Sequence, residues 1–288
     1  MQLQCLPVKI KMINLDLIEL ADLVRPKDIA DEIINQNPDI TIPIPLESIS
    51  YAVGIRDIQY KPLEGLEGAL VANREKSDGI ILINENAIHQ RKRFTLGHEL
   101  GHFLIPRHGH NMECGINEMR TSHQSNLSKA QRIEQEANQF SAEILMPQSL
   151  FQKFHGFRDA PSIDCLISMA THFDVSFEAC VHRYVSLHDE PLVIVFSHEG
   201  KVRYHCKNSS FPFWVNPIKG EAIPYDSFTK ATLPGKSNSI YNGSSSSDTW
   251  LNENRDYNLP EEIFEDVYVM ENGYAATMLY FEEVIEEK

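Results

Sequence analysis

The stretch RFTLGHELGHFLIP, residues 93–106, constrains this chain more than any other part of its sequence. His98 and His102 are four positions apart, and on an α-helix such residues lie about 40° apart around the axis, so their rings project from one face. Glu99 lies one step further round, where it could reach a water molecule on an ion held by both rings. The spacing therefore indicates a metal-binding helix, although a buried helix with two satisfied histidines is the simpler alternative.

A catalytic zinc site needs a third protein ligand and keeps its remaining position for water. The segment RIEQEANQF offers a candidate, because Glu134 and Asn138 share one stripe of a predicted helix beside its apolar face. We predict that Glu134 is the third ligand and that Asn138 accepts a hydrogen bond from a ligating histidine or orients Glu134. Glu136 is the competing carboxylate, which the spacing disfavours only weakly. Gly101 and Ala137 are small enough to let the two helices approach.

Composition restricts the partners of such a site. The chain has 26 basic and 41 acidic side chains, and the resulting formal charge of −15 repels phosphate backbones and anionic lipids. We therefore expect no direct binding to nucleic acid or membrane. Five cysteines without paired spacing predict a reducing, cytoplasmic location. The first twenty residues have neither the apolar run of a secretory signal nor that of a membrane span.

Periodicity and turn residues predict an α+β fold. A hairpin is expected at residues 68–83 around Asp78-Gly79, and an irregular loop at residues 107–127. Ser128 and Gln131 form the capping-box pattern that begins the helix bearing Glu134. Other helices are expected at residues 24–35, 162–172 and 176–187. We expect two domains, residues 1–188 with the HExxH motif and residues 189–288, a smaller α/β domain that senses a signal or docks the substrate.

Three segments together, GALVANREKSDGIILIN, RFTLGHELGHFLIP and EQEANQFSAEILMP, resemble the ImmA/IrrE family of metallopeptidases over about residues 20–188. The resemblance implies a zincin-like peptidase domain, made of helices and a small antiparallel sheet, with a gluzincin-like site. It implies Zn²⁺ held by His98, His102 and Glu134, with Glu99 as the base. It also implies a substrate class, the helix-turn-helix transcriptional repressors of mobile elements or stress responses, which are cleaved to release transcription.

One departure from the family pattern and one alternative function stay open. The family often carries its own DNA-binding helix-turn-helix, whereas LISMATHFDVSFEACVHRYV has that pattern but too little positive charge for phosphate contacts. The alternative is a non-catalytic metal-binding regulator that binds a repressor without cleaving it.

Other features have more than one interpretation. A thiolate from Cys114 could occupy the open position of the zinc ion and silence the enzyme, although a polar lid is the simpler interpretation of its loop. The sequence does not choose the residue that stabilises the oxyanion among His172, His182, Arg183 and Tyr184. The hairpin at residues 68–83 could offer a sheet edge to an extended substrate, or be purely structural.

Overall fold

The computed structural model describes residues 13–115, 127–252 and 256–281, and the chain divides into two compact units. Unit 1 comprises Met1–Gln148 and His172–Ser176, and unit 2 comprises Ser149–Thr171 and Phe177–Lys288. The domain boundary expected after residue 188 stays a prediction.

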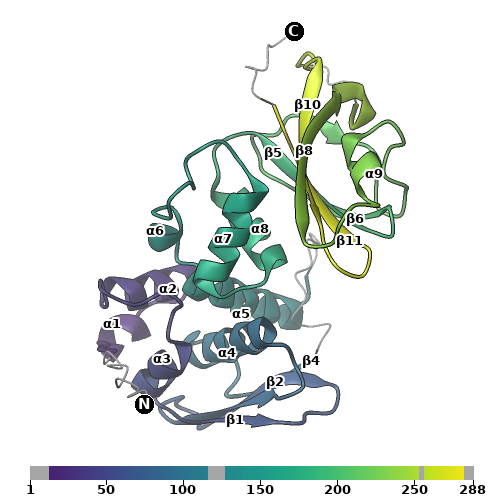
Figure 1. The fold of residues 1–288 in the computed structure, drawn as a ribbon. Helices are drawn as coiled ribbons and strands as arrows, with labels where there is room; N and C mark the ends of the chain where they lie inside the picture. Colours follow the sequence, from purple (N-terminus) through teal and green to yellow (C-terminus); the bar gives the residue numbers. More distant parts are fainter. Residues whose placement is uncertain (1–12, 116–126, 253–255, 282–288) are drawn as a thin grey trace, which may run out of the picture. The chain divides into compact units, whose positions relative to one another are not determined.

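Unit 1 is built on a four-stranded sheet. Its helices in the described residues are α1 (Leu17–Ala21), α2 (Pro26–Asn35), α3 (Leu46–Val53), α4 (His89–Leu104) and α5 (Lys129–Leu145). Its strands there are β1 (Ile55–Lys61), β2 (Leu66–Ala72), β3 (Gly79–Asn84) and β4 (Asn111–Gly115), in the order β1-β3-β2-β4. Only the β1–β3 pair is parallel. Helix α4 lies along the sheet and α5 packs against α4, so the two predicted site helices are neighbours (Figure 1).

Local sequence signals explain the two helices and the hairpin that matter most. The capping box at the start of α5 is present, since the Ser128 side chain accepts from the Gln131 N–H and the Gln131 side chain binds back to Ser128. The hairpin is confirmed as the antiparallel pair β2–β3. Helix α4 begins at His89, four residues before the segment in which the sequence predicted it.

Two expectations for this sheet are wrong. Both strands of the hairpin are internal, because β3 pairs with β1 on its other side and β2 pairs with β4, so the hairpin offers no free edge. The expected irregular loop contains β4 in its described part, and residues 116–126 lie outside the described residues. Among the described strands, β1 and β4 are the edges of this sheet.

Unit 2 is rich in β-strands, and together with unit 1 it confirms the α+β fold class. The helices after α5 are α6 (Gln148–Phe151), α7 (Ile163–Phe173), α8 (Phe177–Leu187), α9 (Phe228–Thr232) and the 3₁₀ turn Ser247–Thr249. The strands are β5 (Leu192–His198), β6 (Lys201–Lys207), β7 (Trp214–Val215), β8 (Ser239–Ser246), β9 (Leu251–Asn252), β10 (Glu262–Val269) and β11 (Tyr274–Tyr280).

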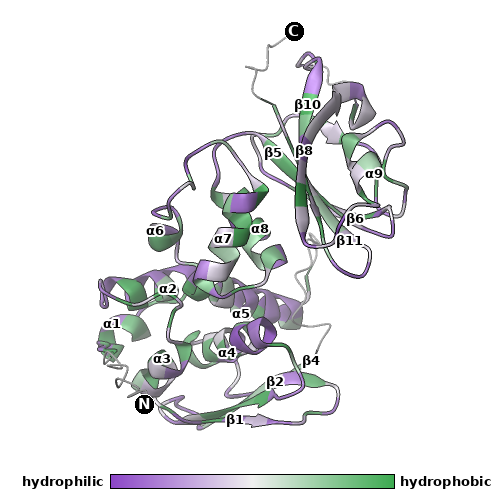
Figure 2. Ribbon diagram, in the orientation of Figure 1, coloured by the Kyte–Doolittle hydropathy of each residue, from purple (hydrophilic) through white to green (hydrophobic). Residues whose placement is uncertain are grey.

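Five of these strands form an antiparallel sheet in the order β6-β5-β11-β10-β8. Its core includes Val193 and Val195 of β5, Ile263 of β10 and the fully buried Trp250. Strand β5 is coloured hydrophobic over most of its length, as expected for a buried internal strand (Figure 2). In the part of the chain that the structure describes, no helix is both long and apolar enough to cross a bilayer.

Candidate metal centre

Helix α4 supplies two of the donor groups from its buried face. His98, Glu99 and His102 are completely buried, and the Nε2 atoms of the two histidines lie 3.0 Å apart. The two rings meet edge to face, with centroids 4.6 Å apart. One turn of helix therefore aims two ring nitrogens at one point, as the i, i+4 spacing predicted.

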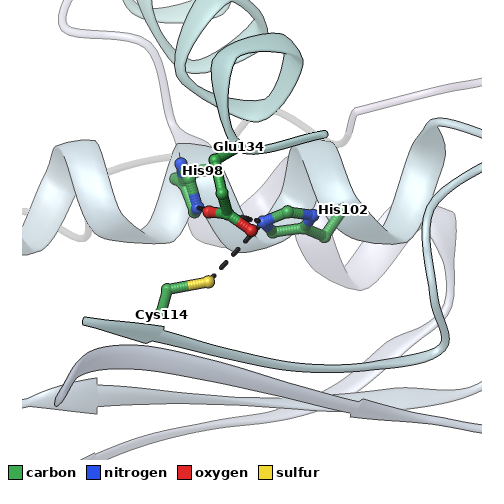
Figure 3. Close-up of side chains that lie close together, drawn as sticks. All are labelled: His98, His102, Cys114 and Glu134. Carbon is green, nitrogen blue, oxygen red and sulfur yellow. Dashed lines mark hydrogen bonds and ion pairs between the residues drawn. The ribbon is translucent and has the colours of Figure 1, made fainter. Parts of the chain in front are cut away.

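Helix α5 brings a carboxylate to the same point. The Oε2 atom of Glu134 lies 3.2 Å from His98 Nε2 and 3.6 Å from His102 Nε2. Figure 3 shows Glu134 descending from α5 between the two rings. Close packing of the helices allows this, because a Cβ at Gly101 would lie only 3.1–3.3 Å from atoms of Phe140 and Ala137.

Each histidine is held by a hydrogen bond through its other nitrogen. His98 Nδ1 lies 2.9 Å from Asn138 Oδ1, so Asn138 contacts a histidine, the first of the two alternatives considered for it. His102 Nδ1 lies 3.0 Å from His108 Nδ1, and His108 Nε2 lies 3.0 Å from Glu136 Oε2. These contacts fix both rings in place, as outer partners of metal-binding histidines do.

The hydrogen-bond partners of the three histidines determine which ring nitrogen of each carries the proton. Burial lowers the pKa of His102 to about 4 and also lowers the pKa of His108, so both are neutral near pH 7. Glu136 Oε2 only accepts, which places the His108 proton on Nε2 and makes its Nδ1 the acceptor for His102. Asn138 Oδ1 likewise only accepts, which places the His98 proton on Nδ1.

With the His98 proton on Nδ1, the Nε2 atoms of His98 and His102 both present lone pairs, 3.0 Å from each other and close to Glu134 Oε2. Three buried acceptors facing one another repel unless a cation lies between them. Nitrogen and carboxylate donors at this spacing suit zinc. The donor set thus fits a metal ion on its own chemistry.

Two further groups adjoin the three donors. Both carboxylate oxygens of Glu99 are buried without an N–H or O–H donor, and burial raises the pKa of Glu99 well above its usual value. Repulsion from Glu134 raises this pKa further, whereas a hydrogen bond with the Cys114 thiol lowers it. The Sγ atom of Cys114 lies 3.5 Å from His102 Nε2 (Figure 3). His98, His102, Cys114 and Glu134 form a group whose donor atoms all lie within 4.8 Å of one another.

The structure gives Glu136 a different position from the competing ligand considered above. Its carboxylate lies 2.5 Å and 2.8 Å from two guanidinium nitrogens of Arg107 and also binds His108. Arg107 and His108 lower the pKa of Glu136 against the opposing effect of burial, so Glu136 is ionised. It does not face the three donors directly.

Sequence reasoning did not single out His108, which lies in the expected irregular loop at residues 107–127. The missing information was the contact between His108 and Glu136, which are 28 positions apart. Of the four residues considered for the oxyanion, Tyr184 is buried in unit 2 against Phe157 and His188, and His182 contacts Tyr204 there.

The helix pair, the sheet beneath it and the buried donors define a zincin-like domain with a candidate metal site. Residues 54–184 match the family model of the IrrE N-terminal-like domain, a peptidase family. This segment is therefore an IrrE N-terminal-like domain, and the family match confirms its resemblance to the ImmA/IrrE family. The family supports a metallopeptidase-like function.

Other comparisons concern the fold. A solved structure, a Mycobacterium tuberculosis transcriptional regulator, is similar with a TM-score of 0.50 and 13% identity, over 88% of this chain and 75% of that chain. At this identity the likeness shows the fold alone. No curated protein matches the chain.

Proposed function

We propose that this protein is a zinc-dependent endopeptidase that cleaves a cytoplasmic protein, namely a helix-turn-helix transcriptional repressor of a mobile element or a stress response. The observation that carries the proposal is the convergence of three lone-pair donors, His98 Nε2, His102 Nε2 and Glu134 Oε2, beside the completely buried carboxylate of Glu99. The substrate class rests on the resemblance to the ImmA/IrrE family.

The roles of the side chains follow from their positions. His98, His102 and Glu134 would hold the ion. A zinc ion held there acts as a Lewis acid toward a peptide carbonyl and lowers the pKa of a water molecule. Glu99 takes the proton from the attacking water and delivers it to the leaving amine, a task suited to a carboxylate whose pKa burial has raised. Asn138 and His108 keep the two ligating rings oriented.

The negative charge of the whole chain is consistent with a basic protein partner. With a formal charge of −15, the protein attracts the positively charged surface of a DNA-binding repressor and repels DNA itself. The enzyme would then act on the repressor rather than compete with it for an operator.

The test incubates the full chain, metal-free or zinc-loaded, with purified repressors encoded near its gene, at stoichiometric enzyme. We expect one repressor to be cut only with zinc. Glu99→Gln should retain zinc and lose about 10²–10⁴-fold in cleavage rate, as expected for removal of a general base. A repressor that binds the zinc-loaded protein and stays intact would contradict the proposal and favour the non-catalytic regulator.

A further inference from the structure

Cys114 is placed at the metal donors by the register of the sheet. It lies on β4 directly opposite Gly68 of β2, so the two residues share one face of the sheet. A Cβ at Gly68 would lie 2.5 Å from Thr95 and 2.7 Å from Glu99, so the missing side chain lets α4 lie directly on this face. The side chain of Cys114 therefore points at α4, and it is completely buried there.

The sulfur atom lies at a distance that suits a shared ion. Given zinc–ligand bonds of about 2.0–2.3 Å, the ligands of a tetrahedral zinc ion lie about 3.3–3.8 Å from one another. Cys114 Sγ is 3.5 Å from His102 Nε2, and Glu134 Oε2 is 3.2 Å and 3.6 Å from the two histidines. The thiol also hydrogen bonds to Glu99, the carboxylate beside the three donors.

We infer that Cys114 is a fourth protein ligand of the metal, so that the resting centre has four protein donors and no open position for water. Sites with three protein ligands are catalytic because the fourth position is free, whereas sites filled by four are closed. A thiolate is also a preferred ligand of zinc. The consequence for catalysis rests on the proposed function: Cys114 slows the wild-type peptidase, because water reaches the metal only while the sulfur is displaced.

The arrangement allows Cys114 to leave without disturbing the other ligands. His98 and His102 belong to α4 and Glu134 to α5, whereas Cys114 belongs to β4, an edge among the described strands that pairs only with β2. Movement of one edge strand would therefore remove the sulfur and retain a three-ligand site.

The test replaces zinc with Co²⁺ in the full chain and records its absorption spectrum. Wild type should show the strong sulfur-to-cobalt charge-transfer band of a thiolate ligand, and Cys114→Ala and Cys114→Ser should lack it. Cys165→Ala, which removes a partly buried cysteine of α7, should keep the band. In competition with a chelator, the two Cys114 variants should bind zinc at least about tenfold more weakly, because a ligand is lost.

Cleavage then separates this inference from the proposed function. Cys114→Ala should cut the repressor faster than wild type does. The double variant that carries Cys114→Ala and Glu99→Gln should lose this increase in cleavage rate. A cobalt-loaded wild type without the band would overturn the inference and leave the peptidase proposal intact. A wild type with the band, together with no cleavage by any variant, would support the fourth ligand and refute the peptidase. Absence of cobalt binding would overturn both.

Discussion

At the scale of single residues, two carboxylates of α5 separated by two positions have different tasks. Glu134 Oε2 faces both histidine nitrogens, whereas Glu136 is held by Arg107 and reaches the site only through His108. We expect Glu134→Gln to lose zinc, and Glu136→Gln to retain it with affinity reduced about 10–100-fold, as for other outer partners. Metal analysis after dialysis against a chelator series measures both.

The matched control for these variants is Glu64→Gln, which changes an exposed carboxylate and should leave zinc affinity unchanged. Loss of zinc in the Glu136 variant with full binding in the Glu134 variant would reverse the assignment. Equal affinity in all three variants would contradict a carboxylate ligand on α5.

A second prediction at this scale concerns the pH dependence of the metal-free protein. Burial lowers the pKa of His102 from 6.5 to about 4. Between these values the unfolded chain binds a proton that the folded chain does not, so lowering the pH favours unfolding. The His102 contribution to the free energy of unfolding is therefore fully present above pH 6.5. It is lost as the pH falls toward 4, by at most about 1.4 kcal/mol per pH unit.

Thermal unfolding of metal-free protein at several pH values measures this effect. The Tm of wild type should fall more steeply from pH 6.5 to pH 4 than that of His102→Gln, which cannot take up the proton. Parallel slopes for the two proteins would mean that His102 is not buried in its neutral form.

At the scale of secondary-structure elements, the distance between α4 and α5 determines whether a site forms. Gly101 contacts Phe140 and Ala137 so closely that a Cβ would lie 3.1–3.3 Å from their atoms. Gly101→Ala should be tolerated, because small shifts relieve this contact and alanine favours the helix. Gly101→Val should cost about 1–3 kcal/mol through overpacking and should weaken zinc binding, since α5 carries Glu134 outward.

Chemical denaturation and chelator competition on the same samples test the Gly101 series. We expect zinc affinity to be highest in wild type, lower in Gly101→Ala and lowest in Gly101→Val. A valine variant that is destabilised but binds zinc like wild type would show that the position of Glu134 does not depend on this contact.

The elements that could be predicted from the sequence are those with local signals. The Ser128 capping box defines the start of α5, and Asp78-Gly79 with its flanking apolar residues defines the β2–β3 hairpin. Strand β1 was missed because it is an edge strand with one buried residue, Ile55, and so has no apolar alternation. It exists through its parallel pairing with β3, a non-local interaction that the sequence pattern does not contain.

In the candidate site, too, local relations could be predicted from the sequence and non-local ones could not. The relation between His98 and His102 is set within one turn of helix, and that between Glu134 and Asn138 within another, so both could be predicted. The position of Cys114 depends on which strand neighbours β2 and on the register that places it opposite Gly68. The sequence offered Cys114 only as a residue of an irregular loop.

At the scale of the whole molecule, all the donor atoms belong to unit 1, from α4, α5 and β4. An ion that binds only the folded state stabilises it by about 4 kcal/mol when its concentration is a thousand times its Kd. Zinc should therefore slow amide hydrogen exchange in α5 and β4 of unit 1 and leave β5 and β11 of unit 2 unchanged. Mass spectrometry of peptides with and without zinc measures this directly.

Hydrogen exchange in unit 2 is the internal reference for the exchange measured in unit 1. Glu134→Gln should show no zinc-dependent protection in either unit, because the third donor is lost while the rest of α5 is retained. Equal protection of β5 and α5 in wild type would mean that the two units unfold together, since an ion bound in unit 1 stabilises unit 2 only through coupled unfolding. Protection confined to unit 1 would show that the metal sets the stability of unit 1 while the β-rich unit opens independently.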